Sequence, residues 1–483
     1  MVSSFICKSA AIYSKLIFET LMDKYSGVRS LPGDFISLLK PVLGAEWPSF
    51  LEAVSSPPVK AAHPHPIKKK AMPPQRRKAV PWCQTAYYLP YDEPVTWDPF
   101  FQAGAYYVQE PGTLFLTAIL SRLYPQKKPE KILDLCASPG GKTTQLLSFI
   151  ASDSLLVANE VVKNRLSSLK QNIIKWAGYN TLVTHADPAR FAALPEYFDL
   201  IVADVPCSGE GMFRKEPEAI KAWSVSHIKA CSIRQQKIIL SALPSLKPGG
   251  YLIYSTCTFN PIENEDNVKW LMKEYGMMKT TLEIPSAWNI KIYEETGAYQ
   301  LYPHRNESEG FFLALLKKNG QAKNSIKTKT QRNVNNDWSR LPDAMAEILE
   351  PFTGEMMATE FLQHKNGMVR RVGPRLPTEL PLLARTLGYT EAGYEVGQII
   401  RNNILPAHPL ALDPLADHFA QRWELTREEA LRFMQKKELP EIPAARGWHL
   451  ATYEGLGIGW AKLLGNRYNN YFPTEWKIRD DES

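Results

Sequence analysis

Residues 131–147, KILDLCASPGGKTTQLL, constrain the fold more than any other stretch of this sequence. A short apolar run meets the turn Pro139-Gly140-Gly141, and an amphipathic segment follows from Lys142. This order predicts a buried parallel strand that leads through a tight turn into a helix. Glycines let a ligand approach the backbone, and the first amides of a helix are free to donate hydrogen bonds. The turn is therefore a candidate site for a small polar ligand.

Two nucleotide-binding patterns and a purely structural turn compete for this stretch. A phosphate loop of the nucleoside-triphosphate type needs a glycine five positions before Gly141, where the sequence has Cys136. A dinucleotide site needs the pattern G-x-G-x-x-G, which residues 137–142 do not supply. A structural strand-to-helix turn stays open on this stretch alone.

Carboxylates follow the next three expected strands of the same domain. The strands are expected at 154–159, 182–186 and 198–203, and the acids that follow them are Glu160, Asp187 and Asp204. Parallel strands bring their carboxyl ends to one edge of a sheet, where open α/β sheets bind ligands. Glu160 lies nineteen residues after Gly141, close to the spacing at which an acid accepts hydrogen bonds from a ribose. The three acids therefore favour a ligand site over a structural turn.

Three rows, DLCASPGGKT, ADVPCSGEGMFRK and YSTCTFNPIENE, occur in this order in the sequence. Together they resemble the RNA cytosine-5 methyltransferases of the Nol1/Nop2/Sun family, and the resemblance covers residues 82–316. It implies an α/β fold with a class I Rossmann-like core that uses S-adenosylmethionine. It also implies a cofactor site built from Cys136, Ala137, Ser138, Pro139, Gly140, Gly141 and Lys142, with Glu160 on the ribose, Asp187 beside the adenine and Asp204 near the methyl-donating end.

The chemistry of cytosine methylation explains why these rows contain two cysteines with a role in the reaction. Carbon 5 of cytosine becomes nucleophilic only after a thiolate adds to carbon 6. The proton on carbon 5 must then leave and the thiol must be eliminated, so a second group has to assist. By resemblance, Cys257 is the nucleophile and Cys207 assists product release. Asp204 and Lys142 complete the implied catalytic set, with Asp204 holding the cytosine edge near its ring nitrogen and amino group.

Composition excludes several other classes of protein. The net charge of +7 suits an anionic partner such as RNA without requiring one. Six cysteines without a C-x-x-C pair indicate neither a metal site nor a disulfide framework, which fits a reducing cytoplasm. No window approaches the roughly 18 continuous apolar residues that a membrane span requires. The other four cysteines, Cys7, Cys83, Cys136 and Cys231, are interpreted as packing residues, although Cys136 also borders the expected cofactor.

The chain is long enough for several domains. We expect an extension of unknown role at 1–30, an N-terminal α+β RNA-binding subdomain at 31–110, the catalytic domain at 111–318, a linker at 319–337, an accessory α/β domain at 338–404 and a PUA-like β domain that binds RNA at 405–483. Residues 55–81 hold seven prolines, seven lysines or arginines and no acid, so we expect them to be solvated. They form either a linker or an arm for RNA phosphates.

Two loops of the catalytic domain also carry expectations. Residues 209–215 are expected to close over the target nucleotide, with Arg214 and Lys215 on flanking phosphates. The acidic row 263–266 is expected to cap the next helix, because carboxylates are favoured at a helix N-terminus.

The tail at 457–473 resembles the PUA-like tail of bacterial family members that act on small-subunit ribosomal RNA. The sequence thus predicts a cytoplasmic, monomeric RNA cytosine-5 methyltransferase that acts on 16S ribosomal RNA or the 30S subunit, without metal or membrane. A transfer RNA substrate is the nearest alternative, and an RNA-binding assembly factor or a DNA methyltransferase are others. The intact Lys142, Asp204, Cys207 and Cys257 argue against the assembly factor, and the threonine-cysteine row argues against the DNA enzyme.

Overall fold

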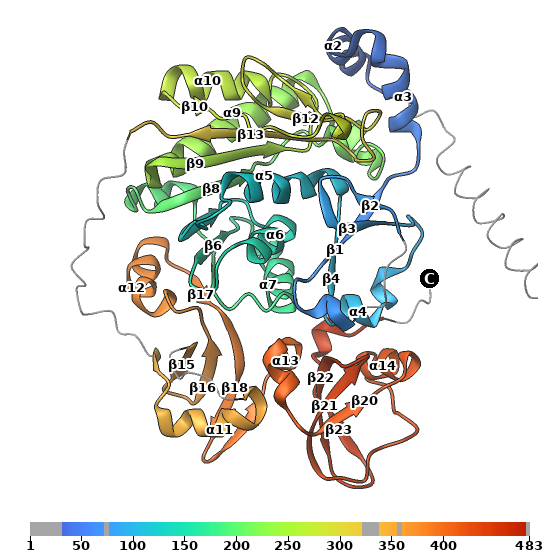
Figure 1. The fold of residues 1–483 in the computed structure, drawn as a ribbon, viewed down its shortest axis with the longest axis vertical. Helices are drawn as coiled ribbons and strands as arrows, with labels where there is room; N and C mark the ends of the chain where they lie inside the picture. The colour runs from blue at the N-terminus through green and yellow to red at the C-terminus, as the bar shows by residue number, and fades with distance from the viewer. Residues whose placement is uncertain (1–30, 72–76, 321–337, 355–359, 480–483) are drawn as a thin grey trace, which may run out of the picture.

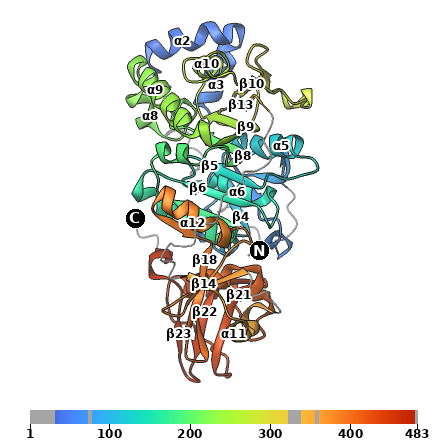
Figure 2. The ribbon, with the colours of Figure 1, turned by 90° about the vertical axis from the view of Figure 1, so that its left-hand side faces the viewer.

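The computed structural model describes residues 31–71, 77–320, 338–354 and 360–479. The expected extension at 1–30 and most of the expected linker at 319–337 lie outside the described residues. The molecule is elongated, with a large α/β domain in the upper half and two smaller C-terminal domains side by side below it (Figures 1 and 2). Within the described ranges, no helix combines the length and apolar character needed to cross a bilayer.

A ten-stranded mixed sheet forms the centre of the large domain. Its strands are β5 (Lys131–Asp134), β6 (Leu155–Asn159), β7 (Thr181–Thr184), β8 (Phe198–Asp204), β9 (Leu246–Thr256), β10 (Met278–Lys279), β11 (Lys291–Ile292), β12 (Tyr299–Leu301), β13 (Phe311–Lys317) and β17 (Thr390–Ala392). The order is β11-β12-β13-β9-β8-β5-β6-β7-β17, with β10 paired to β13. Strands β5 to β9 are parallel to their neighbours among these five, and β13 runs antiparallel to β9. Because the chain continues from β5 to β6 on one side and later to β8 on the other, the strand order reverses between β5 and β8, where ligands of such sheets bind.

Helices cover both faces of this sheet, so its central strands are buried runs of apolar residues. One face is covered by α5 (Phe115–Leu123), α6 (Gly141–Phe149) and α7 (Leu166–Lys175). The other is covered by α9 (Val225–Ala242), α10 (Glu265–Tyr275) and α12 (Leu376–Leu387). The predicted α/β fold with a class I core is confirmed.

The N-terminal subdomain has an antiparallel sheet and three helices. The helices are α2 (Gly33–Leu43), α3 (Trp47–Ser55) and α4 (Pro99–Gln102), and the strands are β1 (Lys60–Pro64), β2 (Ala79–Val80), β3 (Cys83–Leu89) and β4 (Tyr106–Gln109) in the order β2-β3-β1-β4. The α+β character expected for this part of the chain is observed.

The expectation of a solvated proline-rich segment at 55–81 is wrong for its central part. Strand β1 is an inner strand, and the prolines lie at its end and on either side of it, where they remove no ladder hydrogen bond. Lys68 is buried, and its ammonium donates to the carbonyls of Ala103 at 2.9 Å and Lys175 at 2.7 Å. Among the lysines and arginines of the segment whose burial the structure describes, Lys69, Arg77 and Lys78 are exposed as expected.

The accessory part of the chain divides between two sheets. A five-stranded sheet contains β14 (Trp338–Arg340), β15 (Phe361–His364), β16 (Met368–Arg371), β18 (Tyr394–Ile400) and β19 (Asn403–Pro406), beside α11 (Asp343–Thr353). Between β16 and β18, however, helix α12 packs on the catalytic core and β17 pairs antiparallel with β7. The accessory segment therefore completes the edge of the catalytic sheet.

The C-terminal domain is built on a four-stranded sheet. Its elements are α13 (His408–Leu412), β20 (Arg422–Glu424), α14 (Arg427–Met434), β21 (Gly447–Tyr453), β22 (Leu456–Leu463) and β23 (Tyr468–Asn470). One hydrophobic cluster joins this domain to the N-terminal subdomain, since Tyr87 and Phe100 of the subdomain pack with Phe433 and Leu463. The two ends of the described chain therefore share a core.

Candidate active site

The loops that follow β8 and β9 carry the two cysteines singled out in the sequence. These strands are neighbours in the sheet, and their register places Asp204 opposite Ser255. Each loop then turns over the sheet edge, and the sulfur atoms of Cys207 and Cys257 lie 3.1 Å apart. Both side chains are half-buried. Two thiols from distant parts of the sequence are thus brought together at one edge of the sheet.

A buried ion pair lies beside the thiols. The ammonium of Lys142, at the start of α6, contacts a carboxylate oxygen of Asp204 at 2.7 Å. The other oxygen of Asp204 accepts a hydrogen bond of 2.8 Å from the Ser255 hydroxyl. The Asp204 side chain is 34% exposed, whereas that of Lys142 is 12% exposed. The carboxylate is therefore held in place by two partners and still faces the opening of the site.

The charges of this site shift the pKa values of its groups. Burial lowers the pKa of Lys142, but the negative charge of Asp204 and its hydrogen bond outweigh burial, so the net pKa is raised and the lysine stays charged. The hydrogen bond with Cys257 and burial both raise the pKa of the Cys207 thiol. Cys207 is thus held as a neutral thiol beside Cys257.

The glycine turn after β5 has the features of a cofactor loop. Gly140 has φ of 114°, in the left-handed region that favours glycine, and a Cβ there would lie 3.3 Å from the Cβ of Asn172. Asp134, at the end of β5, is fully buried, and one of its carboxylate oxygens has no hydrogen-bond partner. Burial raises the pKa of Asp134 to about 7, although a hydrogen bond from Thr143 and the charge of Lys142 lower it. A cationic ligand group would relieve this buried carboxyl, so the residues fit S-adenosylmethionine.

The remaining predicted cofactor residues lie around the same edge. Cys136 is half-buried, and Ala137 and Ser138 are buried in the turn. Glu160 directly follows β6 and is 3% exposed, with one oxygen accepting from the Val162 amide at 2.7 Å. Asp187 is exposed after β7, where its side chain caps a short helix through the Ala189 amide.

Three buried polar residues, for which the sequence predicted no such role, hold the two cysteine loops together. Glu263 accepts a hydrogen bond from the Ser208 amide at 2.9 Å, next to Cys207. Glu210 accepts from the Phe259 amide at 2.7 Å, two residues after Cys257. The Asn260 side-chain amide joins them, since it donates to Glu210 at 2.9 Å and to Glu263 at 2.7 Å.

We call Glu210, Asn260 and Glu263 the loop clamp. Its signal in the sequence was a pair of acids close to the cysteines, but only the folded chain shows that they contact the opposite loop. The expectation that the row 263–266 caps the following helix is therefore wrong for Glu263, while Glu265 and Asp266 do lie in the first turn of α10.

The expected RNA contact of Arg214 is also wrong. Its guanidinium is 7% exposed and pairs with the carboxylate of Glu309 at 2.7 Å. It also donates to the carbonyl of Ser308 at 2.6 Å. These buried partners hold the loop after Cys207 against the segment that precedes β13. Arg214 is therefore not available to bind a phosphate. Across the described residues, no group of three or more His, Cys, Asp or Glu is arranged to hold a metal ion.

Comparison with known proteins places the chain among ribosomal RNA methyltransferases. Family models match at residues 31–111, described as the N-terminal domain of 16S rRNA methyltransferase RsmF, at 121–317, described as 16S rRNA methyltransferase RsmB/F, and at 420–478, described as the methyltransferase RsmF PUA domain. The ribosomal RNA small subunit methyltransferase F of Aeromonas salmonicida is 32% identical over 83% of this chain and 86% of its own length. The protein of the same name from Enterobacter sp. is 30% identical over 83% and 84%.

A solved structure agrees with these relatives. The methyltransferase homolog protein from Pyrococcus horikoshii is 26% identical, with a TM-score of 0.50 over 62% of this chain and 99% of that one. Fold, site and comparisons together define an S-adenosylmethionine-dependent RNA cytosine-5 methyltransferase. Within this class, the chain belongs to the RsmB/F family of 16S rRNA methyltransferases, in the RsmF group with its own N-terminal and PUA domains.

Proposed function

We propose that this protein methylates carbon 5 of a cytosine in 16S ribosomal RNA through a covalent adduct to Cys257. The observation that supports this most strongly is the 3.1 Å separation of the Cys207 and Cys257 sulfurs, beside the Lys142–Asp204 pair. The names of the relatives support the choice of 16S ribosomal RNA as the substrate.

The two thiols have different roles in this proposal. Cys257 attacks carbon 6 of the cytosine as a thiolate, and the positive charge of Lys142 close by favours that anion. Cys207, whose raised pKa keeps it protonated, acts after methyl transfer. Water takes the proton from carbon 5, the double bond between carbons 5 and 6 re-forms, and the bond from carbon 6 to the Cys257 sulfur breaks. The Cys207 thiol assists by donating a hydrogen bond to the Cys257 thiolate as it leaves.

Asp204 binds the cytosine edge in this proposal. Its partners Lys142 and Ser255 fix the carboxylate, while its exposed part faces the site. A carboxylate at the ring nitrogen and amino group orients the base and stabilises the protonated ring that forms when the thiolate adds. The base must leave its stack to reach this edge, so the nucleotide is bound flipped out of its helix.

The cofactor residues are Cys136, Ala137, Ser138, Pro139, Gly140, Gly141 and Lys142, together with Glu160, Asp187 and Asp204. When bound, S-adenosylmethionine supplies a methyl group on a positively charged sulfur. The unpartnered oxygen of buried Asp134 supports a cationic group in this loop. The position of Glu160 at the end of β6 supports its role as the ribose-binding acid.

We further expect the N-terminal subdomain and the PUA-like domain to bind RNA, and the protein to act as a cytoplasmic monomer on free 16S ribosomal RNA or the 30S subunit. The shared cluster between the N-terminal and C-terminal domains supports a monomer, because their apolar faces are covered within one chain. Light scattering on the purified protein measures the oligomeric state.

A pair of cysteine variants tests the mechanism. Cys257→Ala is expected to lower methyl transfer at least about 10⁴-fold and to abolish the covalent adduct, because the nucleophile is lost. Cys207→Ala is expected to trap the protein on its RNA, which gives a slowed protein–RNA band on a denaturing gel. Cys83→Ala is the matched control, since Cys83 is a buried thiol far from the site in the N-terminal subdomain. Full activity of Cys257→Ala would exclude this mechanism.

Bisulfite sequencing identifies the substrate. Total RNA from cells with and without the gene is compared, and the proposal expects one or more cytosines of 16S ribosomal RNA to lose protection when the gene is absent. Loss of protection in transfer RNA alone would assign the same chemistry to the other substrate.

A further inference from the structure

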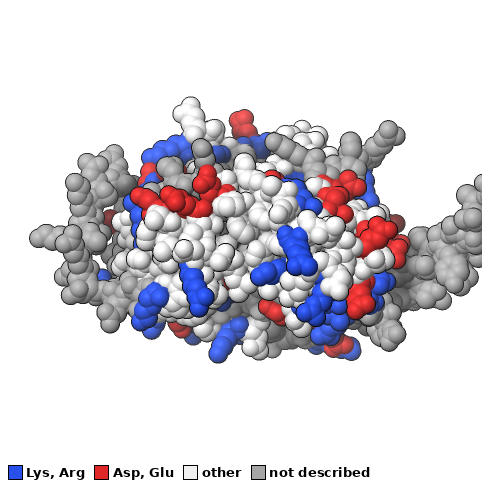
Figure 3. Space-filling model, turned by 90° about the horizontal axis from the view of Figure 1, so that it is seen from below, with Lys and Arg blue, Asp and Glu red and all other residues white. Residues whose placement is uncertain are grey.

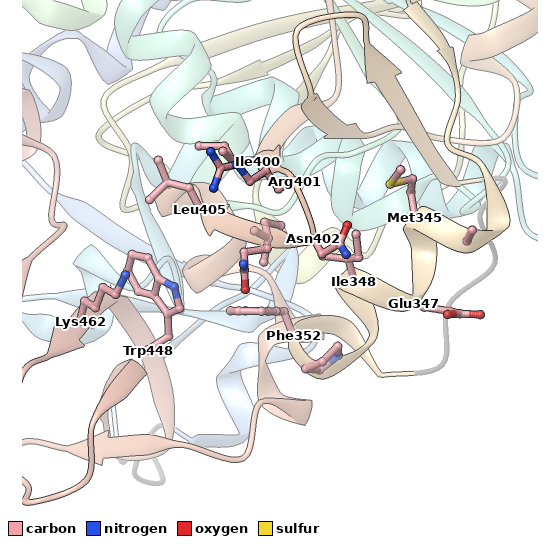
Figure 4. A pocket seen from close by; sticks show the side chains of 14 residues that line it. Met345, Glu347, Ile348, Phe352, Ile400, Arg401, Asn402, Leu405, Trp448 and Lys462 are labelled. Carbon is pink, nitrogen blue, oxygen red and sulfur yellow. The ribbon is translucent and has the colours of Figure 1, made fainter.

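A wide cleft separates the five-stranded accessory sheet from the PUA-like domain, far from the thiols. The cleft has a volume of about 1280 Å³. Helix α11 and the β18–β19 hairpin form one side of it, and strands β21 and β22 form the other (Figure 4). The side chains that line the cleft include Ile348, Phe352, Arg401, Leu405, Trp448 and Lys462.

An aromatic platform with a cation beside it forms the PUA-like wall. The ring of Trp448 is half-buried and meets the ring of Tyr471 at 4.6 Å, with 62° between their planes. The Lys462 ammonium lies 5.4 Å from the centre of the Trp448 ring, and Figure 4 shows the two side chains next to each other. Tyr471 is 36% exposed and meets Trp448 edge to face, so it supports the indole from the side. The half-buried Trp448 ring is the aromatic surface that this wall offers to the cleft.

The opposite wall carries a second cation on a strained turn. Arg401 lies at the tip of the β18–β19 hairpin with φ of 56°, in the left-handed region that a residue with a side chain rarely adopts. Ile400 pairs with Asn403, so Arg401 belongs to a two-residue hairpin turn, and turns of this length require this conformation. Its neighbours Ile400 and Leu405 are 51% and 38% exposed, so the hairpin presents apolar side chains around a cation.

The charges of the cleft are unbalanced. Considering only the parts of the chain that the structure describes, neither Arg401 nor Lys462 is in an ion pair. The one carboxylate of the lining, Glu347, points away from the wall of Trp448 and Lys462 in Figure 4. The lower face of the molecule, to which both domains contribute, has a broad uncharged area with lysines and arginines spaced across it and with groups of acidic residues mostly toward its edges (Figure 3). An anion with a flat apolar part would complement these walls.

We propose that this cleft binds an unpaired segment of the RNA substrate, with a base against Trp448 and phosphates at Lys462 and Arg401. This inference rests on the proposed function. Aromatic rings stack on every base and nearby cations bind the backbone, which is the combination that single-stranded RNA sites use. The volume exceeds the roughly 300–1,000 Å³ of most small-molecule sites, so there is room for more than one nucleotide.

The position of the cleft explains what such a contact would do. Strands β8 and β9, which lead into the cysteine loops, lie in the upper half of Figure 1, whereas α11, β21 and β22, which line the cleft, lie at its lower end. An RNA that fills both sites must therefore extend over both halves of the molecule. Binding in the cleft therefore selects a large, folded RNA and acts on substrate affinity, while the rate of the chemical step depends on the thiols.

The test compares charge reversals inside and outside the cleft. Lys462→Glu, alone and combined with Arg401→Glu, is compared with Arg467→Glu, which reverses one exposed arginine of the PUA-like domain outside the cleft. Trp448→Ala is compared with Trp448→Phe, which keeps a stacking ring. Unmodified full-length 16S rRNA transcript and 30S subunits from a strain that lacks the gene are the probes, with filter binding at two salt concentrations and transfer of labelled methyl groups.

We expect the double variant to raise KM for both probes at least tenfold with kcat unchanged, and to flatten the salt dependence of binding by about two phosphate contacts. Trp448→Ala is expected to raise KM about tenfold, and Trp448→Phe much less. Unchanged KM in the double variant, or equal loss in Arg467→Glu, would overturn the proposal. Loss with 30S subunits but not with the transcript would also overturn it and assign the cleft to a ribosomal protein.

A failure of the proposed function would look different. If the wild-type protein methylated neither probe, the function assigned to the thiols would fail before the cleft variants were compared. If wild-type methylation were normal while the cleft variants matched the wild type, only the inference about the cleft would fail. The thermal melting temperature of each variant checks its folding. Because Arg401 is exposed, its substitution is expected to change the melting temperature by no more than a few degrees from that of the wild type.

Discussion

The cysteine loops and the lower cleft satisfy their polar groups in opposite ways. In the cysteine loops, Glu210, Asn260 and Glu263 are buried and bonded to each other or to backbone amides. In the cleft, Arg401 and Lys462 face the open space and have no carboxylate partner among the described residues. The polar groups of the first region hold its own loops in place, whereas the charged groups of the second region are available to bind a ligand.

This difference separates positioning from recognition. A covalent step needs two sulfurs and a carboxylate within a few tenths of an ångström of the right place, which a buried and fully bonded network provides. Recognition of a flexible strand needs adaptable groups that gain their partners on binding. Substitutions in the two regions should therefore affect different kinetic parameters.

After Cys257, the largest effect is expected at Lys142. Lys142→Met removes the cation beside the thiols and the main partner of Asp204, so kcat should fall about 10³-fold while RNA binding is retained. Single-turnover methyl transfer with saturating RNA measures this. Lys163→Met on the surface beyond β6 provides the control, and a loss of RNA affinity instead of rate in Lys142→Met would contradict the comparison.

A smaller loss of rate is expected from the loop clamp. In Glu263→Gln one acceptor becomes a donor facing the Asn260 amide, so the two cysteine loops separate slightly and kcat should fall about 10- to 100-fold. KM for RNA should not change, which is the reverse of the pattern expected in the cleft. Glu274→Gln, at the exposed end of α10, should be silent. A change in KM alone would show that the clamp acts on recognition.

A pH dependence is expected where α13 packs against α7 of the catalytic domain. Burial, together with the charges of Lys175 and Lys68, lowers the pKa of His408 to about 3. A histidine whose folded pKa is lowered favours the folded state above its unfolded pKa near 6.5, and this stability is lost as the pH falls toward 3. At pH 5 the cost is about 2 kcal/mol.

Chemical unfolding at pH 8 and pH 5 measures this cost. His408→Phe keeps a ring against Phe472 and Trp476 and should reduce the difference between the two pH values, whereas exposed His418→Gln should not. Buried His63 and His65 act with the same sign, because burial lowers their pKa values to about 4 and about 3. If the free energy of unfolding of His408→Phe depended on pH as strongly as that of the wild type, His408 would not contribute to the pH dependence.

The smallest effect is expected at the tip of the cleft hairpin. Arg401→Gly relieves the left-handed backbone and should raise the free energy of unfolding by up to about 1 kcal/mol. If Arg401 contacts RNA, the same variant should bind 16S rRNA more weakly. The melting temperature of Arg401→Gly measures its stability, and filter binding measures its affinity for 16S rRNA. A variant that is both more stable and equally tight in binding would show that the strained turn has no role in recognition.

Local sequence patterns predicted the parts of the site that depend on local chemistry. The glycine turn at Gly140, the strands that end at Asp204 and the loop of Cys207 are each encoded within a few residues, and the fold places them at one sheet edge. Parallel strand order then makes neighbours of β8 and β9, so two cysteines about fifty residues apart meet.

Features that depend on distant partners escaped prediction. Lys60, in the proline-rich segment, lies in an inner strand because β3 and β4 pair on both of its sides. Arg214 is withdrawn from solvent by Glu309, which is nearly a hundred residues later in the chain. Nothing near 390–392 indicates that it completes the catalytic sheet beside β7. The sequence shows whether a residue is charged or apolar, but the tertiary fold decides which partner it contacts.

The cluster shared by the two ends of the chain has a consequence for biosynthesis. Phe433 and Leu463, which cover Tyr87 and Phe100, are synthesised more than three hundred residues after them. Until then the aromatic face of the N-terminal subdomain has no cover, and nascent chains in such a state are prone to aggregate or to need a chaperone. A chain cut short before Phe433 should therefore lose more than its C-terminal domain, because the N-terminal subdomain would be left open.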